Sequence, residues 1–188
     1  MLGKRIFDSI LAMLLIVLLS IPIIVIAAII KLTSRGPVLY WSSRVGKNNE
    51  LFRMPKFRSM RIDTPELPTH LLKDPSAHVT SFGSFLRWTS LDELPQIFSI
   101  LTGKLSFVGP RPALFNQHDL VALRTDRGIH HLIPGLTGWA QVNGRDSLSI
   151  PVKVEFDFEY LKRQSLRFDL QILGLTFIKV LSREGIKH

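Results

Sequence analysis

The most constraining feature of the sequence is an uninterrupted apolar run near its beginning. Residues 10–30 carry no charged side chain and read ILAMLLIVLLSIPIIVIAAII. About 20 apolar residues are enough to cross a bilayer as a helix, whereas the apolar region of a cleaved signal peptide covers only about 7–15 residues. The run therefore predicts a membrane helix and argues against a signal peptide.

The topology of this helix stays open on the residues alone. Basic residues precede and follow the run, so the preference of basic flanks for the cytoplasm gives no single orientation. Pro22 lies near the centre, where it removes a helical hydrogen bond and bends the helix, and the Ser20 hydroxyl is placed to bond a freed carbonyl. A bent helix that re-enters the same leaflet and a kinked helix that spans the bilayer both fit. The flanking basic residues are Lys4, Arg5, Lys31 and Arg35.

Length and composition limit the rest of the chain to one compact domain. The 188 residues are 46% apolar, carry a formal net charge of +9 and include no cysteine. Disulfides, thiolate metal sites and cysteine nucleophiles are thereby excluded, and the charge predicts an anionic partner such as nucleic acid, an acidic membrane or a phosphorylated substrate. We expect a membrane helix with its flanks over 1–35 and a cytosolic, membrane-associated domain over 36–188, mainly α with short β elements and interfacial amphipathic helices.

A strongly basic segment follows the apolar run. Residues 31–62 contain eight basic side chains and one acid, Glu50, so this segment should lie against anionic lipid headgroups. Glycine-containing turns bracket two short apolar runs, 38–41 and 51–54, which predicts a small hairpin. Lys56 and Arg58 lie in a strand-like stretch that suits phosphate contact, although a solvated basic face explains most of the charges individually.

Two adjacent carboxylates, Asp92 and Glu93, stand just before a predicted helix. Pro95 lacks an N–H and fits only the first turn, so the pair lies at or before the helix start. The simplest interpretation is capping, because Ser90 and Glu93 have the spacing of a capping box, which stabilises a helix by roughly 0.3–1 kcal/mol.

Two arginines near this pair favour a functional interpretation. Arg87 lies in a short predicted helix over 84–88, and Arg111 stands between two prolines that stiffen the backbone around one guanidinium. A helix start with neighbouring guanidinium groups attracts phosphate. The region therefore predicts a site for a phosphorylated ligand.

The remaining chain predicts surface loops, one strand and three helices. A glycine-punctuated loop over 133–145 contains Gln141 and Arg145 at polar positions, and such loops let backbone approach a ligand closely. The apolar spacing of the last helix favours a core face and leaves an interfacial role open. We expect a loop over 63–80, a strand over 105–108, and helices over 116–131, 154–163 and 168–183.

Taken together, these segments resemble the bacterial sugar transferase family in its small form, the monotopic polyprenyl-phosphate phosphoglycosyl transferases. The resemblance covers nearly the whole chain, and it rests on the order and spacing of several short motifs that follow an N-terminal membrane segment. The matching segments are residues 4–8, 44–46, 56–60, 90–96, 108–112, 134–135, 141–145 and 169–170.

The resemblance implies a re-entrant membrane helix and an active site on the cytoplasmic face of the bacterial inner membrane. It implies transfer of a phospho-sugar from a UDP-sugar to polyprenyl (undecaprenyl) phosphate with release of UMP, the first membrane step of glycoconjugate assembly. Asp92 is then the nucleophile that forms a covalent phospho-sugar intermediate, and Asp92 and Glu93 are ligands of Mg²⁺. The implied substrate-binding residues are Lys56, Arg58, Arg87, Arg111, Gln141 and Arg145.

Two other classes of function compete with this enzyme. A basic membrane adaptor with the same fold would lack chemistry, and the intact Asp92, Glu93 and Arg111 argue against it. Nucleic-acid binding would not explain residues 10–30, and the sequence lacks an interleaved aromatic and basic RNA motif. We therefore expect inner-membrane lipids as partners and no nucleic acid, and we leave a homodimer open.

Overall fold

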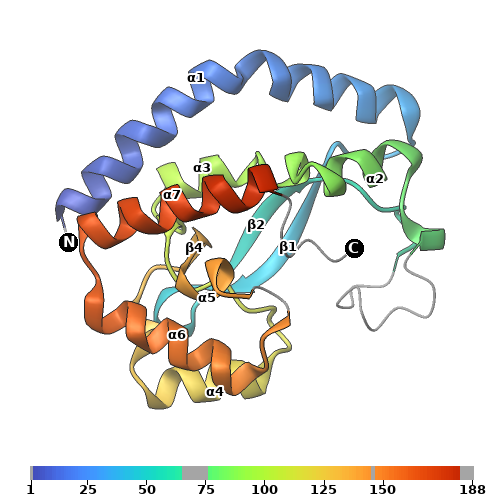
Figure 1. The fold of residues 1–188 in the computed structure, drawn as a ribbon. Coiled ribbons are helices and arrows are strands. Elements are labelled where there is room, and N and C mark those ends of the chain that lie inside the picture. Colours follow the sequence, from blue (N-terminus) through green and yellow to red (C-terminus); the bar gives the residue numbers. More distant parts are fainter. Residues whose placement is uncertain (1, 65–75, 145–146, 183–188) are drawn as a thin grey trace.

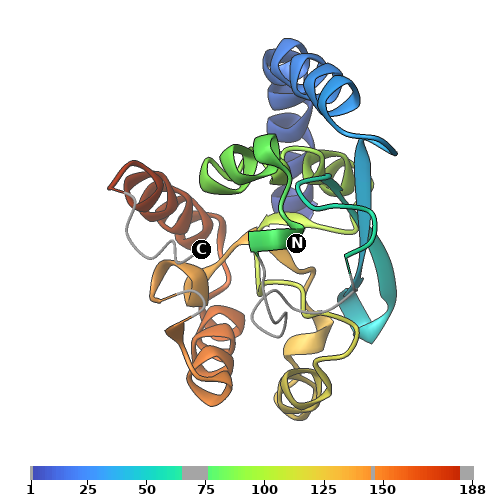
Figure 2. The same ribbon diagram turned by 90° about the vertical axis from the view of Figure 1, so that its right-hand side faces the viewer.

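The structure is a computed structural model that describes residues 2–64, 76–144 and 147–182. Helix α1 (Leu2–Thr33) lies at one end of the molecule, and helices α4 (His118–Asp126) and α6 (Ile150–Arg163) lie at the opposite end (Figures 1 and 2). Among the residues that the structure describes, three further helices of six residues or more lie between these ends. They are α2 (Ser81–Trp88), α3 (Gln96–Leu101) and α7 (Leu166–Ser182). The predicted mixture, mainly helical with short strands, is confirmed.

The predicted hairpin is present and longer than its apolar runs. Strands β1 (Leu39–Val45) and β2 (Leu51–Phe57) pair antiparallel, with Leu39 opposite Phe57 and Val45 opposite Leu51. Asn48 and Asn49 in the connecting turn have φ values of 54° and 62°, a left-handed conformation that asparagine tolerates. The hairpin places the side chain of Lys56 near the end of β2.

A second pair of strands, which is parallel, was predicted only in part. The expected strand over 105–108 forms β3 (Ser106–Val108), but the segment 133–145, expected to be a loop, contains β4 (Gly135–Thr137) and helix α5 (Trp139–Val142). A Cβ atom on Gly135 would lie 2.1 Å from the backbone nitrogen of Gly109, so only glycine permits this approach. The close pairing brings α5 beside the loop that carries Arg111.

The expected helices are present with shifted ends. The helix over 84–88 begins earlier, at Ser81, and the helix over 154–163 is the later part of α6. The helix expected over 116–131 is interrupted at Gly128, where φ is +71°, and a 3-10 turn (Ile129–His131) follows. Part of the loop expected over 63–80 lies outside the described residues.

Helix α1 is continuous through Pro22 and arches over the rest of the protein (Figure 1). It is long and apolar enough to cross a membrane by length and composition, and only 11% of its most apolar window is buried. The Ser20 hydroxyl donates to the carbonyl of Val17 at 2.8 Å. The carbonyl that Pro22 leaves without a partner belongs to Leu18, so this bond does not compensate for the proline.

The first turns of α1 are docked by buried polar contacts. The Lys4 ammonium lies 2.6 Å from the carboxylate of Asp169 in α7, and Asp8, which is 3% exposed, accepts a hydrogen bond of 2.8 Å from the Ser106 hydroxyl of β3. Arg5 donates to the last carbonyls of α3. These contacts set the position of α1 relative to α3, β3 and α7.

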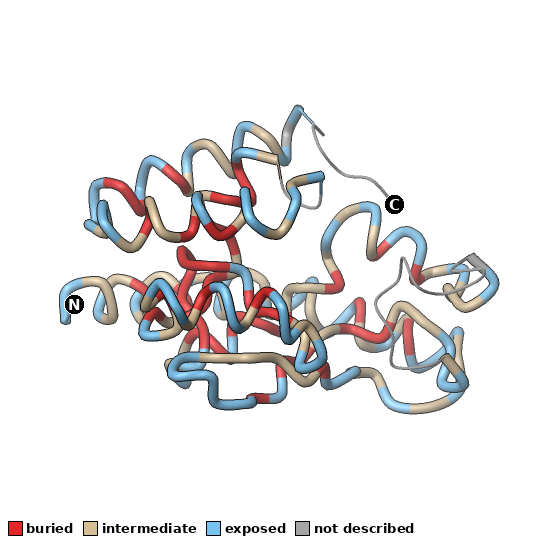
Figure 3. Tube along the Cα trace, turned by 90° about the horizontal axis from the view of Figure 1, so that it is seen from below, coloured by how far each residue is buried: buried red, intermediate tan, exposed pale blue. Residues whose placement is uncertain are grey.

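The buried residues cluster between the helices, near the centre of the molecule (Figure 3). Tyr160 of α6 is 1% exposed and donates to the Asp169 carboxylate at 2.7 Å, and burial raises the pKa of its hydroxyl. In α7, Phe168 and Ile172 are buried, whereas Phe177 and Ile178 are 67% and 60% exposed. The expected core face of this helix is therefore confined to its first half.

Candidate active site

The two adjacent carboxylates lie in a 3-10 turn (Leu91–Glu93) directly before Pro95 and α3, as the position of the proline predicted. The capping box predicted for Ser90 and Glu93 is absent, because Ser90 is left-handed, with φ 57°, and its side chain makes no capping hydrogen bond. Asp92 is 9% exposed. A buried carboxylate without a capping role needs another explanation.

Two cations from distant segments meet the carboxylates. The Lys56 ammonium of β2 lies 2.7 Å from Glu93 Oε1 and 3.7 Å from Asp92 Oδ2. The Arg111 guanidinium, from the loop after β3, lies 3.3 Å from Glu93 Oε1. The hairpin and the parallel strand pair thus bring together four of the residues that the sequence singled out.

The two carboxylates differ in their electrostatic surroundings. Burial raises the pKa of Asp92, and this effect outweighs the nearby Lys56. Burial also acts to raise the pKa of Glu93, but Lys56 and Arg111 together hold that pKa well below its usual range. Glu93 is therefore ionised and paired with Lys56 and Arg111. Asp92 is the more basic of the two carboxylates, because its pKa is raised, and this suits a nucleophile.

A cavity of about 470 Å³ surrounds this acid pair. The volume is in the range of small-molecule sites. Its lining contains more cations than carboxylates, so an anionic ligand is favoured. The charged lining residues are Lys56, Arg87, Asp92, Glu93, Arg111, Arg124 and Lys153, and apolar side chains of α1 and α7 complete it with Leu15, Leu19, Leu173 and Val180.

A buried ion pair supports the loop that carries Arg111. Arg124 of α4 donates to Asp157 Oδ2 of α6 from Nε at 3.0 Å and from Nη2 at 2.6 Å. Its remaining Nη1 donates to the backbone carbonyl of Arg111 at 2.8 Å. Arg124 therefore positions the Arg111 backbone while it also lines the cavity.

The other predicted site residues have different locations. Arg87 and Gln141 line the cavity, and the charge of Arg87 acts on Asp92. Arg58 is not among the lining residues, because its guanidinium donates to Ser34 and to the carbonyl of Arg35, at 2.6–3.0 Å. These contacts hold the segment after α1. Arg145 lies outside the described residues.

Arg124 and Lys153 belong to the cavity but were not predicted from the sequence. Both lie on helices far along the chain from the acid pair. One indication was available in the sequence. Lys153 and Asp157 are four residues apart, so they lie on the same side of a helix, next to the apolar Val154. Two charged residues therefore lie on a side of the helix that should be buried. Charged residues on a buried side are paired or functional.

The acid pair suits a hard divalent cation. Mg²⁺ is commonly held by one or two carboxylates together with substrate phosphates and water. Asp92 and Glu93 provide two adjacent carboxylates inside a cavity that favours anions. Within the described part of the chain, no group of three or more histidine, aspartate or glutamate side chains could hold a metal by itself. Asp92 and Glu93 thus fit an ion that takes its remaining ligands from a bound phosphate and from water.

The described residues define a class of protein that combines a helix suited to a membrane with a cation-rich cavity built around two carboxylates. Within that class, the chain belongs to the bacterial sugar transferase family, whose model matches residues 1–183.

Curated relatives are similar over nearly all of this chain. The UDP-glucose:undecaprenyl-phosphate glucose-1-phosphate transferase of Escherichia coli is 40% identical over 183 residues, which cover 94% of this chain and 39% of that protein. The UDP-N-acetylgalactosamine-undecaprenyl-phosphate N-acetylgalactosaminephosphotransferase of Aeromonas hydrophila is 37% identical over 98% of this chain and 45% of its own. A Bacillus subtilis protein named uncharacterized sugar transferase EpsL is 40% identical over 100% of this chain and 92% of its own. The chain thus spans about two fifths of the first of these relatives.

Proposed function

We propose that the protein transfers a sugar phosphate from a UDP-sugar to undecaprenyl phosphate, yielding undecaprenyl-diphosphate-sugar and UMP. The observation that carries this proposal is the pair Asp92 and Glu93, held by Lys56 and Arg111 inside a cation-rich cavity with apolar walls. Such a cavity suits both a sugar nucleotide diphosphate and a lipid phosphate. The names of the relatives from Escherichia coli and Aeromonas hydrophila support both substrates.

In the first half-reaction, we infer that Asp92 attacks the phosphorus that carries the sugar. A bond forms between a carboxylate oxygen and phosphorus, and the bond from phosphorus to the bridging oxygen breaks. The electron pair stays on the bridging oxygen, which leaves with UMP. Arg87 and Lys56 offset the repulsion between the attacking carboxylate and the anionic donor.

In the second half-reaction, an oxygen of undecaprenyl phosphate attacks the phosphorus held on Asp92. The bond between this phosphorus and the Asp92 oxygen breaks, and the free carboxylate returns. Glu93 remains ionised throughout, because Lys56 and Arg111 hold its pKa low. Because UMP departs before the acceptor reacts, one cavity serves both half-reactions.

We further propose that Mg²⁺ binds at Asp92 and Glu93 together with the donor diphosphate. When bound, the ion supplies positive charge that lowers the repulsion between carboxylate and phosphate. Lys56 keeps its contact with the carboxylates and orients them toward the cavity.

We propose that α1 re-enters the leaflet from which it came and that the cavity faces the cytoplasm. The arch of α1 (Figure 1), the position of Pro22 inside this helix and the basic residues at both of its ends support this topology. Exposed apolar side chains on α2 and α7 suit the same membrane surface. They are Phe85 and Trp88 on α2, and Phe177, Ile178 and Val180 on α7.

The direct test is a turnover assay in a membrane mimic. Protein held in nanodiscs is incubated with undecaprenyl phosphate, Mg²⁺ and each of a panel of UDP-sugars, and released UMP is measured. The proposal predicts UMP release with at least one donor, and only when undecaprenyl phosphate is present for multiple turnovers. Absence of UMP with every common UDP-sugar would contradict it.

A further inference from the structure

The cavity has two walls of different chemistry. One wall is apolar and comes from α1 and α7, through Leu15, Leu19 and Leu173. The other wall is polar and comes from α4, α5 and α6. Because α1 lies at one end of the molecule and α4 and α6 at the other (Figures 1 and 2), the helices that supply the polar wall lie farther from α1.

Lys153 is a cation of this polar wall that pairs with no carboxylate in the part of the chain that the structure describes. Lys56, Arg111 and Arg124 each lie in an ion pair, whereas Lys153 forms no ion pair with any residue of the described ranges. Its charge acts on Asp157, which Arg124 already binds. The charge of Lys153 is therefore available to a ligand in the cavity.

Gln141 gives independent support for a polar ligand at this wall. The side chain is 7% exposed, and neither its Oε1 nor its Nε2 has a hydrogen-bond partner among the described residues. Unpartnered buried amides are rare, because their desolvation is not compensated. A hydrocarbon chain would leave this amide unpartnered, whereas a nucleotide offers both donors and acceptors.

The polar wall is also held rigidly. The indole Nε1 of Trp139 in α5 donates to the Glu159 carboxylate of α6 at 2.8 Å, and the Trp139 ring packs edge-on against Phe156. Gln141 lies on the same short helix as Trp139, and Lys153 lies on α6. These contacts hold α5 against α6, so the backbone positions of the two polar groups are set relative to each other, as a preorganised ligand site requires.

We propose that the polar wall binds the nucleoside monophosphate half of the donor and that Lys153 contacts its departing phosphate, an assignment that rests on the proposed function. When Asp92 displaces this group, the bridging oxygen keeps the electron pair of the broken bond. The leaving UMP gains one negative charge, and no proton is needed. A cation beside this phosphate interacts with it more strongly as the bond breaks and the charge grows. The cation therefore stabilises the transition state and accelerates the step. The lipid acceptor lies against the opposite, apolar wall.

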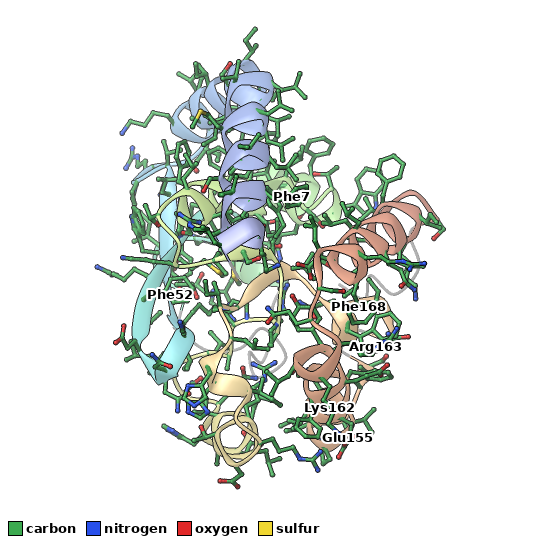
Figure 4. The ribbon with its side chains drawn as sticks, turned by 90° about the vertical axis from the view of Figure 1, so that its left-hand side faces the viewer. Phe7, Phe52, Glu155, Lys162, Arg163 and Phe168 are labelled. Atoms are coloured by element: carbon green, nitrogen blue, oxygen red, sulfur yellow. The ribbon has the colours of Figure 1, made fainter. Side chains whose placement is uncertain are left out.

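Three variants test this assignment. Lys153→Met removes the charge and keeps most of the length, and Lys153→Arg keeps a charge. Lys162→Met is the matched control on the same helix (Lys162 is labelled in Figure 4). The Lys162 ammonium lies over the Phe158 ring, 4.2 Å from its centroid, and Lys162 is not among the residues that line the cavity. Circular dichroism checks that each variant is folded.

Two measurements are made on each variant. The first is the dissociation constant of UMP, determined by calorimetry on protein in nanodiscs. The second is the rate of each half-reaction: formation of the covalent adduct from UDP-sugar without acceptor, and discharge of that adduct by undecaprenyl phosphate. UMP binding needs no turnover, so it tests Lys153 even if the assay of the proposed function fails.

Lys153→Met should weaken UMP binding roughly tenfold or more and slow adduct formation by a similar factor, as expected for a lost charged hydrogen bond. Discharge by undecaprenyl phosphate should be unchanged, Lys153→Arg should restore most of the loss, and Lys162→Met should match the wild type. Unchanged UMP affinity in Lys153→Met, or a slower discharge with normal adduct formation, would overturn the assignment.

Discussion

Replacing Arg124 by glutamine should destabilise the protein strongly, because it leaves a buried carboxylate unpaired. Asp157 is 1% exposed and receives two N–H donors from Arg124, at 3.0 and 2.6 Å, and burial raises its pKa. Removing one partner of a buried ion pair costs about 3–5 kcal/mol. A chain of this size loses roughly 2–4 °C of unfolding midpoint per kcal/mol, so the midpoint should fall by about 6–20 °C.

The matched control is Arg127→Gln. Arg127 pairs with Glu155 of α6 at 2.6 Å, but the two side chains are 39% and 59% exposed. An exposed pair contributes about 1 kcal/mol or less, so this midpoint should fall by about 4 °C at most.

Thermal unfolding in nanodiscs, followed by tryptophan fluorescence, measures both variants. In the double variant Arg124→Gln with Asp157→Asn, the buried charge is removed, and part of the lost stability should return. Equal losses for Arg124→Gln and Arg127→Gln would refute the reasoning, because burial would then make no difference.

Three further predictions concern the metal, the membrane and the docking of α1. EDTA should abolish UMP release and added Mg²⁺ should restore it, whereas full activity in chelator would exclude a metal at Asp92 and Glu93. The chain has no cysteine, so single cysteines introduced at Gly3 and Thr33 can be labelled separately. Both cysteines should resist an impermeant thiol reagent added outside intact cells and should react after permeabilisation. Labelling of only one of them from outside would indicate a helix that spans the membrane. Tyr160→Phe removes the donor 2.7 Å from Asp169 and should cost about 1.5–3 kcal/mol of stability, measured by the same unfolding assay, with an unchanged midpoint as the contrary result.

Elements set by local patterns could be predicted from the sequence. The hairpin follows from turn residues between two apolar runs, and α2 and α6 follow from helical spacing. The pairing of β3 with β4 could not be predicted, because each strand has three residues and the partners are nearly thirty positions apart. Gly135 made the segment read as a loop in the sequence, but the glycine is present because the strand approaches Gly109 closely.

The candidate site was predictable only where chemistry is concentrated in the sequence. Asp92 and Glu93 stood out because two carboxylates adjoin a proline-defined helix start. The sequence could not show which way Arg58 points, and its guanidinium binds backbone instead of lining the cavity. Arg124 could not be predicted as a site residue, because it lies on α4, whose sequence carries no motif for phosphate binding.

The central claim is that Asp92 carries the phospho-sugar, and intact-mass spectrometry tests it most directly. Wild-type protein, Asp92→Asn and Glu93→Gln are each incubated with a UDP-sugar and Mg²⁺ in the absence of undecaprenyl phosphate. The account predicts an added mass of one phospho-sugar on the wild type and none on Asp92→Asn, which changes the charge of the attacking oxygen with almost no change in shape. Glu93→Gln should still trap some adduct, because Asp92 remains. An adduct on Asp92→Asn, or near-normal turnover by that variant, would contradict the account.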